Sequence, residues 1–291
     1  APNIPPAEHI RKALCEEAMK PENYVYAISD TKKLLDTVAD WYKRRYDVEL
    51  EKDEIMSLYG SQEGISRVAL TIANPGDTVL VPNPGYPVFE LGPLLNDAHI
   101  EYYELREENN YLIDFDSIPE EVAKKAKAII VSYPANPICR LAPVSFYKEL
   151  IAWANKYNVI VLHDNAYSEL VYDGKRGISF LSVEGAKEIG IEFNSLSKTY
   201  NLTGARISFA VGNKEIISQF KKLRSQIDYG IFLPVQKAAV AALNGPQDSV
   251  ERNRAEYERR RNTLRDGLDS IGWKGLVSEG TMFAWDPLPK G

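Results

Sequence analysis

Short apolar runs alternate with helix-like patterns along most of this chain, and that alternation limits the folds that it can adopt. The runs that suit strands are 78–81, 100–104, 128–133, 159–163, 189–194 and 206–211. The stretches with helical spacing are 32–47, 62–73, 87–94, 118–125, 145–157, 213–227 and 248–270. This alternation predicts an α/β fold, with a mainly parallel sheet and helices on both of its faces.

The composition excludes several classes of function. The net charge of −6 over 291 residues disfavours nucleic acid and anionic membranes as partners. Two cysteines (Cys15 and Cys139) and three histidines form no metal-ligand spacing, so we expect no metal and a reduced, cytoplasmic setting. No apolar run approaches the roughly 20 residues that a membrane span needs.

Polar side chains follow three of the expected strands. They are Tyr133 to Asn136, Asp164 to Tyr167, and Ser195 to Lys198. In an open parallel sheet, ligands bind beyond the carboxyl ends of the strands. We therefore expect one site that is built from these three segments.

The third segment opens a hydroxyl-rich loop, Ser195 to Arg206, between two expected buried strands. A lysine ammonium near a core is costly unless it is paired or discharged, and a neutral lysine can form a Schiff base with a carbonyl. Ser195, Ser197 and Arg206 are groups that can hold a phosphate beside Lys198. The loop predicts pyridoxal 5'-phosphate as a covalently held cofactor, and a surface lysine in a polar loop is the alternative.

Four further features fit such a cofactor, and three of them have a plainer alternative. Asp164 can pair with the pyridinium nitrogen, or cap a helix. Tyr167 and Asn136 can donate to the ring oxygen, although Asn before proline also suits a turn. Tyr86 can stack on the ring or simply pack at a boundary. The turn Tyr59–Gly64 precedes a helical pattern whose first N–H groups suit a phosphate.

The ordered set GSQEG, PGYP, NP, DNAY and SLSKTYNLTGAR resembles the class I/II aminotransferases, which are fold-type I pyridoxal-phosphate enzymes, and in particular their LL-diaminopimelate, aspartate and aromatic branch. The resemblance runs from about residue 3 to the last residue. It implies amino-group transfer between an amino acid and a 2-oxo acid, with Lys198, Asp164 and Tyr167 as catalytic residues. The cofactor-binding residues that it implies are Tyr26, Ser61, Gln62, Tyr86, Asn136, Asp164, Tyr167, Ser195, Ser197, Lys198 and Arg206.

The resemblance also implies an assembly and a domain plan. Tyr26 resembles the tyrosine that reaches the partner subunit's phosphate, which implies a homodimer with shared active sites, and Tyr229 falls in the partner-facing loop. The implied plan is an extended segment at 1–30, a cofactor-binding large domain at 31–247, an interdomain helix at 248–270, and the start of an incomplete small domain at 271–291. Residues 281–285 read as a strand in that last part.

Three departures from the family pattern bear on activity. Asn136 is followed by Pro-Ile-Cys rather than Pro-Thr-Gly, and Thr31 stands where the family has glycine. The arginine that clamps the substrate carboxylate in the family would fall beyond Gly291. Because losing a positioning group can cost about 10²-fold in rate, we expect cofactor binding with weak or no turnover. A carbon–sulfur β-lyase and an inactive cofactor-binding scaffold are the alternatives.

Overall fold

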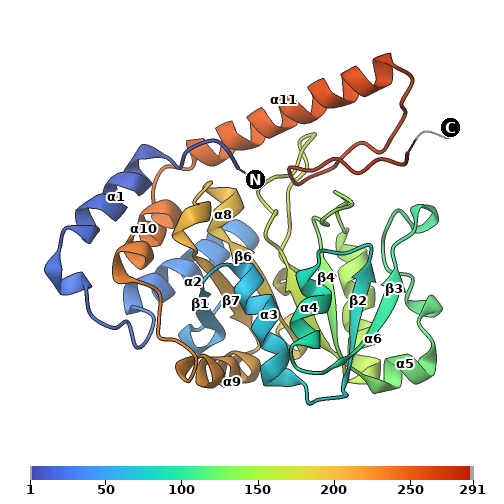
Figure 1. Cartoon of the computed structure of the whole chain (residues 1–291), viewed down its shortest axis with the longest axis horizontal. Helices are drawn as coiled ribbons and strands as arrows, with labels where there is room; N and C mark the ends of the chain where they lie inside the picture. The colour runs from blue at the N-terminus through green and yellow to red at the C-terminus, as the bar shows by residue number, and fades with distance from the viewer. Residues whose placement is uncertain (1, 289–291) are drawn as a thin grey trace.

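Seven strands form one sheet in the computed structural model, which describes residues 2–288. The strand order is β1-β7-β6-β5-β4-β2-β3 (Figure 1). Neighbouring strands are parallel from β3 to β6, whereas β7 runs antiparallel to both β6 and β1. The bounds are β1 Ile55–Leu58, β2 Thr78–Asn83, β3 His99–Glu104, β4 Ala126–Ser132, β5 Ile160–Asp164, β6 Gly190–Ser195 and β7 Ser208–Gly212. The expected mainly parallel sheet is confirmed, and β1 is an addition that the sequence pattern does not predict.

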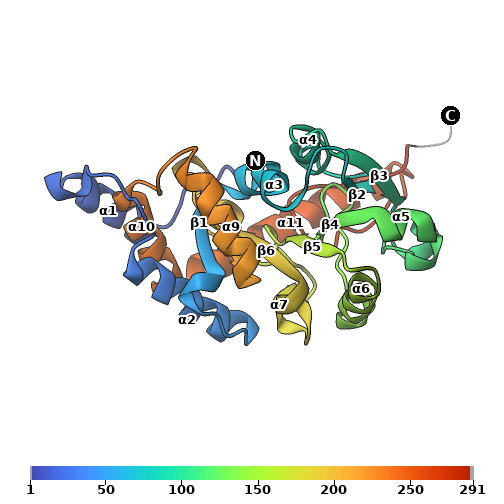
Figure 2. The same cartoon turned by 90° about the horizontal axis from the view of Figure 1, so that it is seen from below.

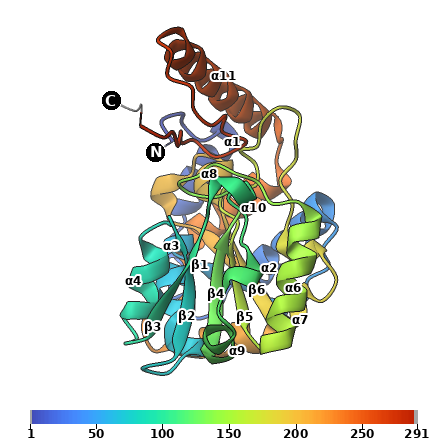
Figure 3. The same cartoon turned by 90° about the vertical axis from the view of Figure 1, so that its right-hand side faces the viewer.

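Helices cover both faces of the sheet, with α3, α4 and α9 on one face and α2, α6 and α7 on the other (Figures 2 and 3). The long helix α11 crosses above the end of the sheet at which α8 lies (Figure 1). The bounds are α1 Glu8–Ala18, α2 Lys32–Tyr46, α3 Ser61–Ile72, α4 Val88–Leu94, α5 Glu120–Lys125, α6 Val144–Tyr157, α7 Ala186–Ile189, α8 Leu196–Thr199, α9 Lys214–Ser225, α10 Leu233–Asn244 and α11 Asp248–Ser270.

Helix α2 illustrates why these segments fold as they do. The Thr31 hydroxyl accepts a hydrogen bond from the Leu34 N–H at 3.3 Å and caps the helix start. Val38 and Tyr42 lie on the buried face, and each such apolar side chain contributes about 1.5–3 kcal/mol on burial. The helix ends where Asp47 adopts a left-handed conformation.

The sheet separates two apolar layers, because successive side chains of a strand point to opposite faces. Phe193 and Leu162 pack with α3 residues such as Val68 in one layer. Val161 packs with the α2 and α6 residues, among them Tyr42 and Tyr147, in the other. Polar groups on either face of the sheet are therefore buried.

The amino-terminal segment departs from expectation. Residues 1–30 are not extended throughout, because Glu8–Ala18 forms α1, which packs along α10 and buries Ile10 completely. Good helix formers fill 8–18 despite the proline-rich opening. The alanine-rich α10 carries a weak amphipathic signal, and the sequence pattern does not predict it.

The carboxyl-terminal segment corrects a second expectation. Residues 281–285 do not form a strand, since Thr281 has a positive φ of 68° and the nearby pairing is a single bridge from Val171 to Gly280. The expected helix at 248–270 is confirmed as α11. Residues 1 and 289–291 lie outside the described residues, so the proposed bounds 1–30 and 271–291 are described only in part.

Candidate active site

The carboxyl ends of β4, β5 and β6 lie at one edge of the sheet, below α11 (Figure 3). Ser132 ends β4, Asp164 ends β5 and Ser195 ends β6. Ser132 pairs in register with Asp164 across the parallel strands, so their side chains project side by side. The edge therefore brings the ends of three strands together, as the strand pattern predicts.

Lys198 lies on α8, the single turn that follows β6. The Ser195 hydroxyl accepts a hydrogen bond from the Ser197 N–H at 3.2 Å and so caps this turn. The Lys198 Nζ lies 5.9 Å from the centre of the Tyr167 ring. Burial and the nearby Arg206 guanidinium lower the pKa of Lys198, whereas Asp164 opposes that shift. A larger fraction of neutral amine is therefore present near neutral pH than for a solvent-exposed lysine.

Asp164 is buried with an unsatisfied oxygen. Burial raises the pKa of its carboxyl to about 6, against the lowering effects of His163, the Ala166 N–H and Lys198. Within residues 2–288, the Asp164 Oδ1 and the neighbouring Ser132 hydroxyl are buried without a hydrogen-bond partner. Because an unpaired buried acceptor costs free energy, these atoms mark a place for a ligand that donates a hydrogen bond.

Open helix N–H groups and the Arg206 guanidinium lie together at the start of α3, and we call this group, Gly60 to Gln62 with Arg206, the cradle. Gly60 is the N-cap with φ of +95°, and it contributes no capping side chain to the first N–H groups, those of Ser61 and Gln62. Arg206 donates to the Tyr59 carbonyl at 3.2 Å, and a Cβ on Gly60 would collide with its guanidinium. Open helix N–H groups beside a guanidinium suit a phosphate.

Two tyrosines adjoin this arrangement. Tyr86 donates to the Gln62 Oε1 at 3.0 Å, and burial and the Asp164 charge raise the pKa of Tyr86. Burial, then Asp164 and Tyr86, likewise raise the pKa of Tyr167. Both phenols are therefore protonated near neutral pH and can donate hydrogen bonds. Asp164 thus lies in electrostatic range of Lys198, Tyr86 and Tyr167, and Arg206 in range of Lys198 and Tyr86.

Asn136 and Tyr26 are not joined to this group by a hydrogen bond within residues 2–288. Asn136 is half-buried in the loop after β4. Cys139, which stands at the family's glycine, keeps a left-handed φ of 64°, and its N–H donates to the Ala135 carbonyl at 2.8 Å, so the loop still forms a tight turn. The Tyr26 ring packs on Tyr229 at 4.9 Å and is 78% exposed.

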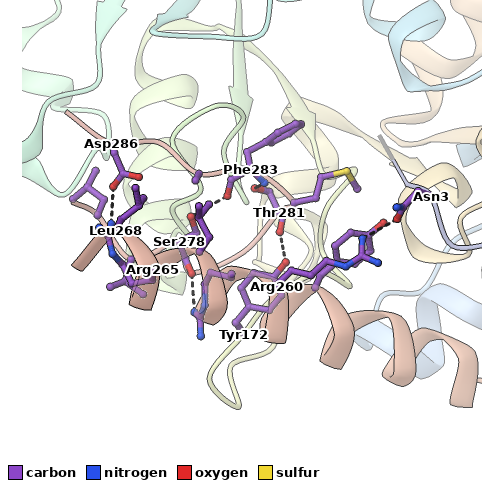
Figure 4. Close-up of a pocket in the computed structure, with 16 residues that line it drawn as sticks. Asn3, Tyr172, Arg260, Arg265, Leu268, Ser278, Thr281, Phe283 and Asp286 are labelled. Carbon is purple, nitrogen blue, oxygen red and sulfur yellow. Dashed lines mark hydrogen bonds and ion pairs between the residues drawn. The ribbon is translucent and has the colours of Figure 1, made fainter. Parts of the chain in front are cut away.

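A separate cavity of about 240 Å³ lies between α11 and the segment 276–286. Figure 4 shows Tyr172 beside Thr281 and Arg265 beside Asp286 in its wall. Its lining includes Phe283, whose ring meets the Tyr167 ring edge-on at 5.7 Å. The cavity therefore borders the site through the contact between Phe283 and Tyr167.

Sequence reasoning selects the turn Tyr59–Gly64 but assigns no separate role to Gly60 or to the Tyr59 carbonyl, and it omits Ser132. Gly60 has a readable signal, because a glycine directly before a helical pattern suits a positive φ at a phosphate-binding turn. The Tyr59 carbonyl and the Ser132 hydroxyl have none, because their roles depend on Arg206 and Asp164, which are distant in sequence.

The fold and site define a class of enzyme: α/β proteins that carry a lysine of depressed pKa at the carboxyl edge of a mixed, mostly parallel sheet. Residues 1–291 match the family described as aminotransferase class I and II. The chain belongs to this family and is an aminotransferase.

Relatives and solved structures agree with that assignment. The chain is 43% identical over 292 residues to the LL-diaminopimelate aminotransferase of Dehalococcoides mccartyi, covering all of this chain and 75% of the relative. It is 44% identical over 292 residues to that of Aquifex aeolicus, covering all of this chain and 76% of the relative. A probable N-succinyldiaminopimelate aminotransferase from Thermus thermophilus superposes with a TM-score of 0.94 at 33% identity, covering 99% of this chain and 78% of that one.

The family implies pyridoxal phosphate as cofactor, and the residues present fit it. The orphaned Asp164 oxygen suits a pyridinium N–H, and the Gly60–Arg206 cradle suits the phosphate. Among residues 2–288, no three His, Cys, Asp or Glu side chains gather as a metal site, and no helix is long and apolar enough to cross a membrane.

Proposed function

We propose that this chain binds pyridoxal phosphate on Lys198 and uses it to move an amino group between an amino acid and a 2-oxo acid. One observation carries the proposal. A lysine of depressed pKa, a buried carboxylate with an unpaired oxygen and an anion cradle converge at one sheet edge. The three groups match the aldehyde, the ring nitrogen and the phosphate of that cofactor.

Pyridoxal phosphate, when bound, supplies an aldehyde that condenses with amines and a ring that withdraws electrons from the substrate α-carbon. The chain's own residues have distinct tasks around it. The neutral Lys198 Nζ is the nucleophile, and it also takes and returns the proton of the substrate α-carbon. The Asp164 carboxylate accepts the ring N–H, and the Tyr167 phenol donates to the ring oxygen, for which Asn136 is a second donor.

The remaining residues hold and cover the cofactor. Arg206 and the N–H groups of Ser61 and Gln62 bind the phosphate, with the hydroxyls of Ser195 and Ser197 beside them. Tyr86 covers the ring from α4's side of the site. These contacts fix orientation, which accounts for a large part of the rate of a positioned reaction.

Reconstitution with pyridoxal phosphate tests this proposal. We expect the protein to develop a near-visible absorbance band that persists through desalting and that changes when an amino donor is added. Formation of the matching 2-oxo acid, in an amount equal to the bound cofactor, shows the transfer itself. A protein that keeps no chromophore after desalting contradicts the proposal.

The substrate is inferred from the relatives. The two curated relatives described above are LL-diaminopimelate aminotransferases at 43% and 44% identity. We propose LL-diaminopimelate as the amino donor of this chain as well. Rates with LL-diaminopimelate, aspartate, alanine and tyrosine, each at the same concentration and with 2-oxoglutarate as acceptor, distinguish the candidates. A faster reaction with any of the other three donors rejects this substrate.

We further propose a homodimer in which Tyr26 reaches the partner's phosphate cradle. Tyr26 and Ile28 are each 78% exposed, and the Gly230 N–H donates to the Ala27 carbonyl at 2.6 Å, so the segments 24–28 and 227–232 form one surface. Exposed apolar side chains on it are Tyr24, Val25, Tyr26, Ile28, Ile227, Tyr229 and Phe232. A contiguous apolar surface of this kind is typical of a protein interface.

Sedimentation velocity tests the dimer. Ile28→Asp should weaken self-association by about 100-fold or more, because it buries an unpaired charge in the interface. Leu95→Asp is the matched control, since Leu95 is similarly exposed on the far side of the sheet, at the end of α4. A wild-type monomer at micromolar concentration contradicts the dimer.

A further inference from the structure

A completely buried carboxylate lies on the opposite face of the sheet from the cofactor site. Glu192, the third residue of β6, has no exposed surface. Its Oε1 accepts from the Tyr42 hydroxyl at 2.9 Å, and its Oε2 accepts from the Phe180 N–H at 2.9 Å. The Ser179 hydroxyl lies within 3.0 Å of both oxygens. The acid is therefore held by groups from α2 and from the turn before η5 (Phe180–Ser182).

His163 completes this network. Its Nδ1 lies 3.0 Å from the Glu192 Oε2, and its Nε2 lies 3.2 Å from the Tyr147 hydroxyl. Burial raises the pKa of Tyr147 well above its ordinary value, so the phenol keeps its proton. The imidazole Nδ1 is hydrogen-bonded to Glu192, and Nε2 and the Tyr147 hydroxyl are hydrogen-bonded to each other. Both Glu192 oxygens accept hydrogen bonds from Tyr42, Ser179 and Phe180, which is the role of a carboxylate.

The network is tied to the cofactor site through β5 and β6. His163 directly precedes Asp164, and the register pairs His163 with Glu192 and Asp164 with Phe193. Alternation along the strands places His163 and Glu192 on the α2–α6 face and Asp164 on the other. His163, which is hydrogen-bonded within the network, and Asp164, which has an unpaired oxygen, are therefore adjacent residues of β5.

We propose that Glu192 and His163 are positioning residues, which lock the end of β5 and impose a negative potential at Asp164, where the cofactor's ring nitrogen would bind. This inference rests on the proposed function. The mechanism above does not use either side chain. A purely apolar pair would fill the same space without a desolvation cost, so the buried charge is the feature that needs a role.

The sign of the effect follows from electrostatics. Removing a buried negative charge makes every nearby protonated form less stable, so its pKa falls. The titratable and charged groups of the cofactor site come from four places. Asp164 and Tyr167 belong to β5 and the loop after it, and Lys198 belongs to α8. Tyr86 precedes α4, and Arg206 follows η6 (Thr203–Ala205). Glu192 faces His163 from β5, Tyr42 and Tyr46 from α2, and Tyr147 from α6.

Spectrophotometric titration of the cofactor-loaded protein tests the proposal. In Glu192→Gln, which retains the shape and most of the hydrogen bonds, we expect the pH midpoint of the bound chromophore to fall by about 0.5 pH unit or more. Tyr103→Phe is the control, because it removes another buried hydrogen bond of this sheet, from Tyr103 to the Ile130 carbonyl at 2.6 Å. Its midpoint should equal that of the wild type.

A milder variant covers the case in which Glu192→Gln does not fold. Ser179→Ala removes one donor and leaves the charge, so the less screened carboxylate should move the midpoint upward, by about 0.2–0.3 pH unit. Opposite shifts in the two variants support the proposal, since a merely structural role does not produce them. Unchanged midpoints in a wild type and variants that all bind cofactor overturn it. A wild type that forms no chromophore instead rejects the proposed function.

Discussion

Two buried carboxylates lie on opposite faces of neighbouring strands, and they differ in how they are satisfied. Glu192 accepts hydrogen bonds from Tyr42, Ser179 and Phe180 and contacts His163. Asp164, at the end of the adjacent strand, has an oxygen without a partner among the described residues. The fold itself satisfies Glu192, whereas Asp164 keeps an oxygen that is available to the proposed cofactor.

The difference assigns a stabilising role to the carboxylate of β6 and a ligand-binding role to the carboxylate of β5. A buried acid with three or four donors strengthens the native state, and removing it leaves those donors unpaired. A buried acid without a donor weakens the empty protein, and natural sequences keep such groups where a ligand repays the strain. The predictions below use substitutions that should affect one side of the contrast without affecting the other.

The largest expected effect is at Lys198. Lys198→Ala should lower the rate of amino transfer by about 10³-fold or more, because it removes both the nucleophile and the group that moves the α-proton. Lys222→Ala on α9 is the control, an exposed lysine whose loss should leave the rate unchanged. Because weak turnover is expected, single-turnover conversion of an amino donor by the cofactor-loaded protein measures both. A Lys198→Ala variant within tenfold of the wild type breaks the assignment.

On the satisfied side, Glu192→Gln should lower the free energy of unfolding by about 1–3 kcal/mol, because the amide nitrogen replaces one acceptor oxygen and leaves its buried donors unpaired. Urea denaturation of the cofactor-free protein at neutral pH measures it. Glu256→Gln provides the comparison, since Glu256 is a solvent-facing acid with two arginine partners, and we expect little change there. Equal losses of unfolding free energy in the two variants contradict the stabilising role of the Glu192 network.

On the unsatisfied side, Asp164→Asn should stabilise the cofactor-free protein above pH 6. Burial raises the pKa of Asp164 from 3.8 to about 6, so the wild type loses stability relative to the variant as the pH rises through that window. The difference reaches at most roughly 3 kcal/mol and is absent below pH 4. Urea denaturation at pH 4 and at pH 8 gives the two values. A variant that is less stable than the wild type at pH 8 shows that Asp164 is already satisfied.

The smallest expected effect concerns the phosphate cradle. Gly60→Ala should weaken cofactor binding by about 10-fold, because its Cβ would meet the Arg206 guanidinium and its φ is +95°. Gly76→Ala is the matched control, with φ of +82° and open space around the new atom. Both should lose about 1 kcal/mol of stability from backbone strain, but only Gly60→Ala should change the dissociation constant in a fluorescence titration.

The sequence predicts the cofactor-site residues around Asp164, but it does not predict the hydrogen-bond network around Glu192. Lys198 and Asp164 are predictable, because each follows an apolar run that ends at the ligand-binding edge of a sheet. Glu192 looks like one polar residue in an apolar strand, and its partners at positions 42, 163 and 179 come from separate elements. Nothing local in the sequence indicates that these residues meet.

The errors at the two ends of the chain have a related cause. The run at 281–285 is apolar because Met282 and Phe283 pack beside Tyr167, rather than because it pairs as a strand. Helix α1 is held by its packing on α10, a contact between segments more than 200 residues apart. Tertiary packing rather than local propensity decides both segments.

Reduction of the cofactor-loaded protein with borohydride, followed by peptide mapping, tests the central claim most directly. The account predicts one pyridoxyl group per chain, located on Lys198, and none on Lys187 or Lys221. A pyridoxyl group on any other lysine, or no stable adduct at all, contradicts it.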